Sequence, residues 1–258
     1  MASEAHRKRH FPWIDYSPSR YDIRKLVDGA RTIDQLNIER DRRAAILMAS
    51  DDPTYRELGE FLHQVDNDVP LPMGHCPLNA NLFQIWGTSK VLRVLSGFDD
   101  VWMITVFDRN DECQPSELSS IDWAHLHAKV RARVIASFGT SLTLFAAGEV
   151  DYNDKTGFFR PHHHLFVAGC RGWSRDRFRH WYPDDGAIEV DELPTLKERA
   201  TAISYALKNI AYLHPFEQQG PERCNFRLHP REFRPHMQYL SKHDYRDFLF
   251  CMNFRLPA

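Results

Sequence analysis

The strongest constraint on how this chain can fold lies in residues 142–168, where two apolar segments flank a polar turn. Leucine, phenylalanine, alanine and valine dominate both segments, and residues 153–157 between them read Asn-Asp-Lys-Thr-Gly. This composition is typical of a turn joining two strands. The pattern therefore predicts a β-hairpin with strands over residues 142–150 and 161–168. Folding the hairpin about Lys155 or Thr156 brings Glu149 opposite His162.

Three consecutive histidines, His162, His163 and His164, begin the second predicted strand. Because strand side chains alternate between faces, His162 and His164 point to one side and His163 to the other. Glu149 joins the first pair, and two imidazoles with one carboxylate suit a divalent metal that keeps open coordination positions. The hairpin thus predicts a metal site. The run of three leaves open which two histidines bind, and a plain surface cluster is the alternative.

Length and hydrophobic content allow a large core. The chain has 258 residues, of which 43% are hydrophobic, enough for one large domain or for a domain with an accessory lobe. Residues 1–75 are expected to form a mainly helical accessory region, with helices over 22–27, Ile33–Met48 and 54–65. Three prolines and a glycine in residues 67–77 mark the boundary. Residues 76–258 then form the main domain with a C-terminal extension.

Charge and cysteine usage exclude some classes of protein. The five cysteines never form a CxxC pair, so neither a disulfide framework nor a zinc knuckle is indicated. No apolar run reaches membrane-spanning length and the N-terminus lacks a secretory signal, so we expect a cytoplasmic protein without membrane contact. The net charge of −2 argues against indiscriminate nucleic-acid binding, although arginines cluster locally after residue 160.

The order of the remaining elements indicates the α+β class. Apolar spacing, β-propensity and capping residues predict a strand, a helix, the two hairpin strands, a short strand and a helix. This order suits an antiparallel sheet with helices packed on one face. The ranges are Val101–Phe107, a helix capped by Ser120 or Asp122 and reaching residue 138, the hairpin, residues 187–190, a helix over 195–213 and a final helix over 241–250.

The predicted helix over residues 195–213 carries a second set of chemical groups. Tyr205 lies roughly 200° around the axis from the core residue Ile203, and Lys208 and Tyr212 share its side. A phenol has a pKa of about 10, but a nearby metal or ammonium group favours its ionised form. Tyr205 and Lys208 are therefore expected to project toward a neighbouring site. The alternative is that Tyr205 is an ordinary half-buried aromatic residue and Lys208 a solvated charge on the helix surface.

A further His-hydrophobic-His sequence, His125-Leu126-His127, falls in the helix predicted before the hairpin. Residues two apart on a helix lie about 200° apart and cannot bind one ion together. This match is therefore interpreted as incidental.

Taken together, Pro161 to Val167, the upstream Glu149 and the later Tyr205-Ala206-Leu207-Lys208 resemble the signature of the HUH endonucleases, which include rolling-circle replication initiators and single-strand transposases. The resemblance covers about residues 101–213. It implies an HUH/RRM-like core in which Glu149, His162 and His164 bind one Mg²⁺ or Mn²⁺. His163 departs from the pattern, because the family has a hydrophobic residue at that position.

The resemblance further implies that Tyr205 is the nucleophile and that Lys208 orients the DNA or the tyrosine. Attack on single-stranded DNA, at an origin or a transposon end, would leave a 5′-phosphotyrosine and a free 3′-hydroxyl without ATP. A second catalytic tyrosine at Tyr212, or a nucleophile at Tyr16 or Tyr21 as in relaxases, is the alternative. No GxxxxGK[ST] loop is present, so unwinding would have to come from a host helicase.

Basic and aromatic residues after the metal strand suit phosphate tracking and base stacking, as in single-strand binders. The residues expected to contact DNA in this way are Arg160, Arg171, Trp173, Arg175, Arg177, Arg179 and Tyr212, and Trp181 is a further candidate for base stacking. The function expected is a nicking and joining endonuclease, most like a plasmid or phage replication initiator. The alternatives are a single-strand transposase or relaxase, a sequence-specific DNA-binding or regulatory protein that has the same fold but lacks cleavage, and a metallohydrolase without a covalent intermediate.

Overall fold

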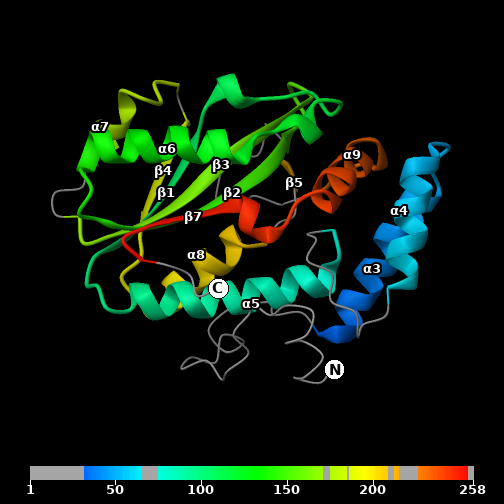
Figure 1. Ribbon diagram of the computed structural model, residues 1–258, viewed down its shortest axis with the longest axis horizontal. Coiled ribbons are helices and arrows are strands. Elements are labelled where there is room, and N and C mark those ends of the chain that lie inside the picture. Colours follow the sequence, from blue (N-terminus) through cyan, green and yellow to red (C-terminus); the bar gives the residue numbers. More distant parts are fainter. Residues whose placement is uncertain are drawn as a thin grey trace.

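A β-sheet forms the centre of the computed structural model, which describes residues 32–65, 75–170, 175–184, 186–208, 212–214 and 226–254 (Figure 1). Five strands run antiparallel in the order β4-β1-β3-β2-β7, while β5 pairs parallel with β2 and antiparallel with β6. The strands are β1 (Val101–Phe107), β2 (Thr143–Asn153), β3 (Phe158–Ala168), β4 (Ile188–Glu192), β5 (Tyr212–His214), β6 (Phe226–Arg227) and β7 (Leu249–Met252). The predicted α+β class and antiparallel sheet are confirmed.

Helices cover both faces of the sheet, so the expectation of helices on one face is wrong (Figure 1). The reason is that β2 and β3 are apolar at consecutive positions, which makes both of their faces hydrophobic. The helices are α3 (Ile33–Met48), α4 (Pro53–Gln64), α5 (Pro77–Leu95), α6 (Trp123–Phe138), α7 (Arg175–Arg179), α8 (Leu196–Ala206) and α9 (Pro230–Ser241), with short 3₁₀ turns η1 (Arg109–Asp111), η2 (Leu118–Ser120) and η3 (Tyr245–Phe248).

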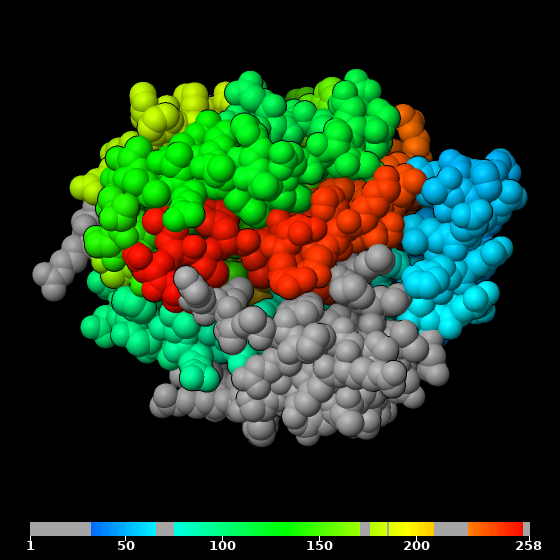
Figure 2. All heavy atoms as spheres, in the orientation of Figure 1, coloured from blue at the N-terminus to red at the C-terminus, as the bar shows by residue number. Residues whose placement is uncertain are grey.

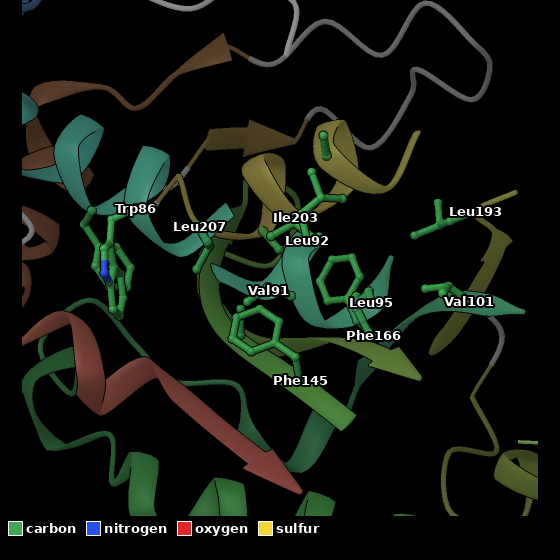
Figure 3. Packing of buried hydrophobic residues seen from close by; sticks show 14 of the residues in the cluster. Trp86, Val91, Leu92, Leu95, Val101, Phe145, Phe166, Leu193, Ile203 and Leu207 are labelled. Atoms are coloured by element: carbon green, nitrogen blue, oxygen red, sulfur yellow. The ribbon is translucent and has the colours of Figure 1, made fainter. Parts of the chain in front are cut away.

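The core between the sheet and α5 with α8 is made of large side chains that alternate along the strands (Figure 3). Phe145 of β2 and Phe166 of β3 pack there against Leu92 of α5 and Ile203 of α8. The intervening residues of the same strands face the other way, where Leu144 and its neighbours pack against α6 and α7. Strand alternation therefore assigns each residue of the hairpin to one of two layers.

Several predicted elements agree with the structure. The helix Ile33–Met48, the strand Val101–Phe107 and the short strand near residue 188 are confirmed, and α4 lies within one residue of its predicted bounds. Asp122 caps α6 by accepting a hydrogen bond from the backbone N–H of His125. The predicted helix over residues 22–27 lies outside the described residues. Residues 79–95, which had no assignment, belong to α5.

Two predicted helices in the C-terminal part of the chain differ from the structure. The helix over residues 195–213 ends at Ala206, and Tyr212 starts strand β5. The final helix over 241–250 does not form, since those residues contribute η3 and β7. The true last helix, α9, starts at Pro230, a position where a missing N–H costs nothing. The helix also contains Pro235 in its interior.

The described part of the predicted accessory region is helical, and α3 and α4 lie at one end of the molecule (Figure 2). Leu47 and Leu62 share a hydrophobic cluster with Phe159 of β3 and Met237 of α9. The division into domains at residue 75 stays a prediction. Within the described ranges, no helix combines the length and the apolar character that crossing a membrane requires.

Candidate metal centre

The register of the hairpin is the one that the turn predicted. Glu149 of β2 lies directly opposite His162 of β3, and Ala147 lies opposite His164. Gly157 closes the turn with a positive φ of 74°, a conformation that glycine adopts without strain. Glu149, His162 and His164 consequently point to the same face of the sheet, toward α8.

These three side chains form a buried group that could hold a metal ion, with donor atoms within 4.8 Å of one another. The Oε2 atom of Glu149 lies 3.2 Å from Nε2 of His164 and 3.6 Å from Nε2 of His162. Two imidazoles and one carboxylate on one side of an ion leave the opposite positions open. The chemistry of the donor set therefore fits a divalent cation that also binds a substrate oxygen.

Outer partners fix the orientation of both rings. His162 Nδ1 lies 3.2 Å from the carbonyl oxygen of Arg160, which can only accept a hydrogen bond. His162 therefore donates from Nδ1, and in its neutral form it presents an unprotonated Nε2 to the centre. His164 Nδ1 is 2.9 Å from the hydroxyl of Thr105 on β1. Such second contacts are typical of metal-binding histidines.

Electrostatics keep the carboxylate ionised. Burial by itself would raise the pKa of Glu149, but Lys208 and the two histidines hold that pKa well below its usual range. Burial lowers the pKa of His164. Burial acts in the same direction on His162, yet Asp151 and Glu149 outweigh it and raise the pKa of that ring. A proton on His162 therefore competes with a cation for the same nitrogen.

Tyr205 and Lys208 lie against this group. The Tyr205 ring meets the His164 ring edge to face, with centroids 5.6 Å apart. Lys208 Nζ lies 3.0 Å from Oε1 of Glu149 and 3.3 Å from the centroid of the Tyr205 ring. Tyr205 is 38% exposed, so a substrate can reach it. Partial burial raises its pKa, while the Lys208 ammonium acts in the opposite direction.

The position of α8 is fixed by contacts along its whole length. A capping box between Thr195 and Glu198 starts the helix. The buried guanidinium of Arg199 donates to the carbonyl oxygens of Leu193, of Leu95 at the end of α5 and of two residues in the α5–β1 loop. Near the other end, Gln84 of α5 donates to Ser204. These ties place the end of α8, and with it Tyr205 and Lys208, beside the hairpin.

His163 faces the opposite layer, as the alternation predicts. Its Nε2 is 2.9 Å from Nδ1 of His127 on α6, whose Nε2 lies 2.9 Å from the carbonyl oxygen of Asp247. Burial lowers the pKa of both rings, so both are neutral near pH 7. Since the carbonyl only accepts, His127 donates from Nε2 and accepts from His163. Of the incidental His125-Leu126-His127 pair, His127 thus has a structural partner.

Asp151 is a site residue that the sequence reasoning missed. It follows Glu149 by two positions on β2, so it shares the same face, and its Oδ2 lies 3.7 Å from Nε2 of His162. It is 8% exposed. The two-residue spacing from Glu149 was the signal that could have found it.

The residues predicted to bind DNA are scattered over the structure. Arg160 lies on the metal face of β3, with its guanidinium 5.1 Å from the centroid of the Phe107 ring. Helix α7, which carries Arg177 and Arg179, packs on the α6 side of the sheet, away from the metal face. Trp181 donates to Ser137 and packs in that same layer. Among the predicted residues whose side chains the structure describes, Arg160 alone lies on the metal face.

For two of the remaining predicted residues the structure gives the secondary-structure element. Arg175 lies in α7 and Tyr212 in β5, where it begins a strand and does not share a helical face with Tyr205. The interpretation of Tyr212 as a second helical tyrosine is therefore wrong. Arg171, Trp173, Tyr16 and Tyr21 lie outside the described residues.

No protein-family model matches this chain, and comparison with curated proteins and with solved structures likewise finds no match.

Proposed function

We propose that this chain is a metal-dependent single-stranded DNA endonuclease of the HUH type that nicks and joins DNA through Tyr205. The observation that carries the proposal is the contact between two parts of the sequence some forty residues apart. Tyr205 and Lys208 lie directly against the group formed by Glu149, His162 and His164. A metal group alone suits many reactions, whereas an accessible tyrosine beside it supplies a nucleophile.

Glu149, His162 and His164 would hold the cation, for which Mg²⁺ or Mn²⁺ is proposed. A divalent ion there would polarise a non-bridging oxygen of the scissile phosphate. The Tyr205 oxygen attacks phosphorus, and the bond from phosphorus to the 3′ oxygen breaks. Tyr205 gives up its proton and the departing 3′ oxygen takes one up. Joining is the reverse reaction. Because the phosphotyrosine bond retains the energy of the broken phosphodiester, the reaction needs no nucleoside triphosphate.

Lys208 supports this role because its ammonium opposes the rise in the pKa of Tyr205 that burial causes. The buried ion pair with Glu149 keeps that ammonium in place. Arg160 lies on the same face of the sheet and is proposed to contact the DNA backbone. The resemblance to rolling-circle initiators makes an origin or a transposon end the proposed target, with a host helicase as the proposed partner in unwinding.

The test is to incubate the protein with labelled single-stranded oligonucleotides and Mn²⁺ and to look for an adduct that survives denaturant. We expect an adduct with the natural chain and none with Tyr205→Phe or Glu149→Gln. The matched control is Tyr55→Phe, a half-buried tyrosine of α4, which should form the adduct at the normal rate. An adduct that persists in Tyr205→Phe would overturn the assignment of the nucleophile.

Asp151 favours a second candidate, a metallohydrolase in which water attacks the phosphate. A carboxylate 3.7 Å from a ligand nitrogen is placed to hold such a water. In that case Tyr205→Phe cleaves at the normal rate without ever giving an adduct, while Asp151→Asn loses cleavage. Oligonucleotide binding without any cleavage would favour a regulatory DNA-binding protein instead.

A further inference from the structure

The two carboxylate oxygens of Glu149 face different partners. Oε2 is directed at the Nε2 atoms of His162 and His164, at 3.6 and 3.2 Å. Oε1 lies 3.0 Å from Nζ of Lys208. A carboxylate can bind a cation through one oxygen while the other accepts from an ammonium group. Glu149 thus has a metal side and a lysine side.

We propose that Lys208, acting through Glu149, weakens the binding of a divalent cation alone and couples it to the binding of a phosphodiester anion. Lys208 is on this view a positioning residue that sets the charge of the site. The identification of the anion as single-stranded DNA rests on the proposed function, whereas the effect of Lys208 on cation affinity does not.

The argument comes from the charges buried around the three ligands. Glu149 and Asp151 each carry one negative charge, Lys208 carries one positive charge, and all three are at least nine-tenths buried. In the form that binds a cation both histidines are neutral, and these groups then sum to a single negative charge. A divalent cation alone reverses that sign, and buried uncompensated charge is costly. One phosphodiester group, with its single negative charge, restores neutrality.

The lysine is not in a position to move away easily when a cation binds. Its Nζ lies over the face of the Tyr205 ring, 3.3 Å from the centroid, and its side chain is 9% exposed. Moving it would lose a cation–π contact as well as the ion pair with Glu149. The ammonium therefore stays close to the cation and repels it until an anion binds between or beside them.

Binding linkage makes the prediction reciprocal. If the anion strengthens cation binding by a given factor, the cation strengthens anion binding by the same factor. Without Lys208, the two carboxylates carry a charge of −2 and a divalent cation brings the site to neutral, so an anion has no excess positive charge to compensate and its binding strengthens cation binding less. Removing the lysine charge should therefore tighten cation binding and reduce the coupling.

The experiment measures Mn²⁺ affinity by isothermal titration calorimetry, with and without a saturating single-stranded oligothymidylate. Every protein carries Tyr205→Phe, which prevents cleavage and keeps the aromatic ring. We compare this parent with added Lys208→Met, Lys208→Arg or Lys197→Met. Lys197 is an exposed lysine in the first turn of the same helix and serves as the matched control.

In the parent, we expect the oligothymidylate to strengthen Mn²⁺ binding roughly tenfold. Lys208→Met should bind Mn²⁺ alone roughly tenfold more tightly than the parent and should lose most of the gain from the oligonucleotide. Lys208→Arg keeps the charge, so it should resemble the parent, as should Lys197→Met. A purely structural role for Lys208 predicts the opposite result, weaker Mn²⁺ binding in Lys208→Met, because Glu149 would lose its support.

Weaker or unchanged Mn²⁺ binding in a folded Lys208→Met protein would overturn the inference, as would a Lys208→Arg protein that behaves like Lys208→Met. Folding is checked by circular dichroism, and if Lys208→Met does not fold, the charge-neutral Lys208→Gln replaces it. The proposed function fails separately, through the absence of a Tyr205 adduct in the natural chain. Tighter Mn²⁺ binding in Lys208→Met with no adduct would support the charge inference and reject the nuclease.

Discussion

His162 and His164 face α8 on one side of β3, and His163 faces α6 on the other. On the α8 side, two rings converge on Oε2 of the buried Glu149, at 3.2 and 3.6 Å. On the α6 side, the single ring of His163 hydrogen bonds to His127 and packs edge to face against Trp123, with centroids 5.5 Å apart. The two faces therefore differ in what the histidines contact: the carboxylate of Glu149 on the α8 side, and the rings of His127 and Trp123 on the α6 side.

This difference shows that the neighbours of a buried histidine decide its role. Near Glu149 and Asp151, the pKa of His162 is raised although burial opposes the rise. Without a carboxylate, burial and His127 hold the pKa of His163 well below its usual range. On one face His162 can hold a proton where a cation could bind, whereas on the other face His163 is a neutral ring in a chain of hydrogen bonds.

The largest expected effect is on Mn²⁺ binding, which should depend on the histidines that face α8 and not on His163. We expect His164→Ala to weaken Mn²⁺ binding by more than about 100-fold, since it removes a ligand and not an outer partner. His163→Ala should change Mn²⁺ affinity only a few-fold. It should instead lower the free energy of unfolding by about 2–3 kcal/mol, because it leaves a cavity and an unpaired His127 nitrogen.

Calorimetry with Mn²⁺ and urea unfolding in the presence of a chelator measure the two quantities independently. If His163→Ala lost Mn²⁺ binding as fully as His164→Ala, the assignment of ligands to one face would be wrong.

The next effect tests how tightly the α6 face is packed. Gly148 lies opposite His163, and a Cβ atom built on it would come within 2.2 Å of the Trp123 ring. Gly148→Ala should therefore lower the free energy of unfolding by about 3 kcal/mol, since a buried ring has to shift. The matched control is Gly97→Ala, where the nearest atom is 3.5 Å away and the cost should be below about 1 kcal/mol. Equal costs in urea unfolding would contradict the packing of Trp123.

Local periodicity made one half of the candidate site predictable. The two-residue alternation of a strand places Glu149, His162 and His164 together once the turn is located, and the structure has this register. The same rule would also have placed Asp151. Tyr205 was found because its helix carries an apolar stripe that leaves it on another side.

Long-range pairing made the rest unpredictable. The apolar spacing continued to residue 213, yet α8 ends at Ala206 and residues 212–214 pair with β2. Nothing near Tyr212 in the sequence indicates a strand partner sixty residues earlier. Likewise, the partner of His163 lies on helix α6 and not on a neighbouring strand, so the hairpin sequence alone could not identify His127.

A smaller effect concerns the orientation of a ligand ring. Thr105→Val keeps the shape of the side chain but removes the hydroxyl that lies 2.9 Å from Nδ1 of His164. We expect Mn²⁺ affinity to fall roughly tenfold, as for other outer partners of metal ligands. Thr105→Ser retains a hydroxyl and should stay close to the natural protein. An unchanged affinity in Thr105→Val would show that β1 does not hold the ring.

The smallest effect is a difference in pH dependence, measured by urea unfolding between pH 7.5 and 5.5 with a chelator present. Unfolded histidine has a pKa of about 6.5. The pKa of folded His163 is lowered, so below pH 6.5 the unfolded state takes up a proton that the folded state refuses, and stability falls. The pKa of folded His162 is raised, so its contribution is present below pH 6.5 and is lost as the pH rises through the folded pKa.

The two substitutions should therefore change the acid side in opposite directions. His163→Gln should make the loss of stability on acidification shallower, and His162→Gln should make it steeper, each by at most about 1.4 kcal/mol per pH unit. His75, with a pKa of about 4, and His236, with a pKa of about 3, add the same acid loss to both variants. The difference between the two curves thus isolates the two faces of β3, and slopes that change in the same direction would mean that both histidines share one environment.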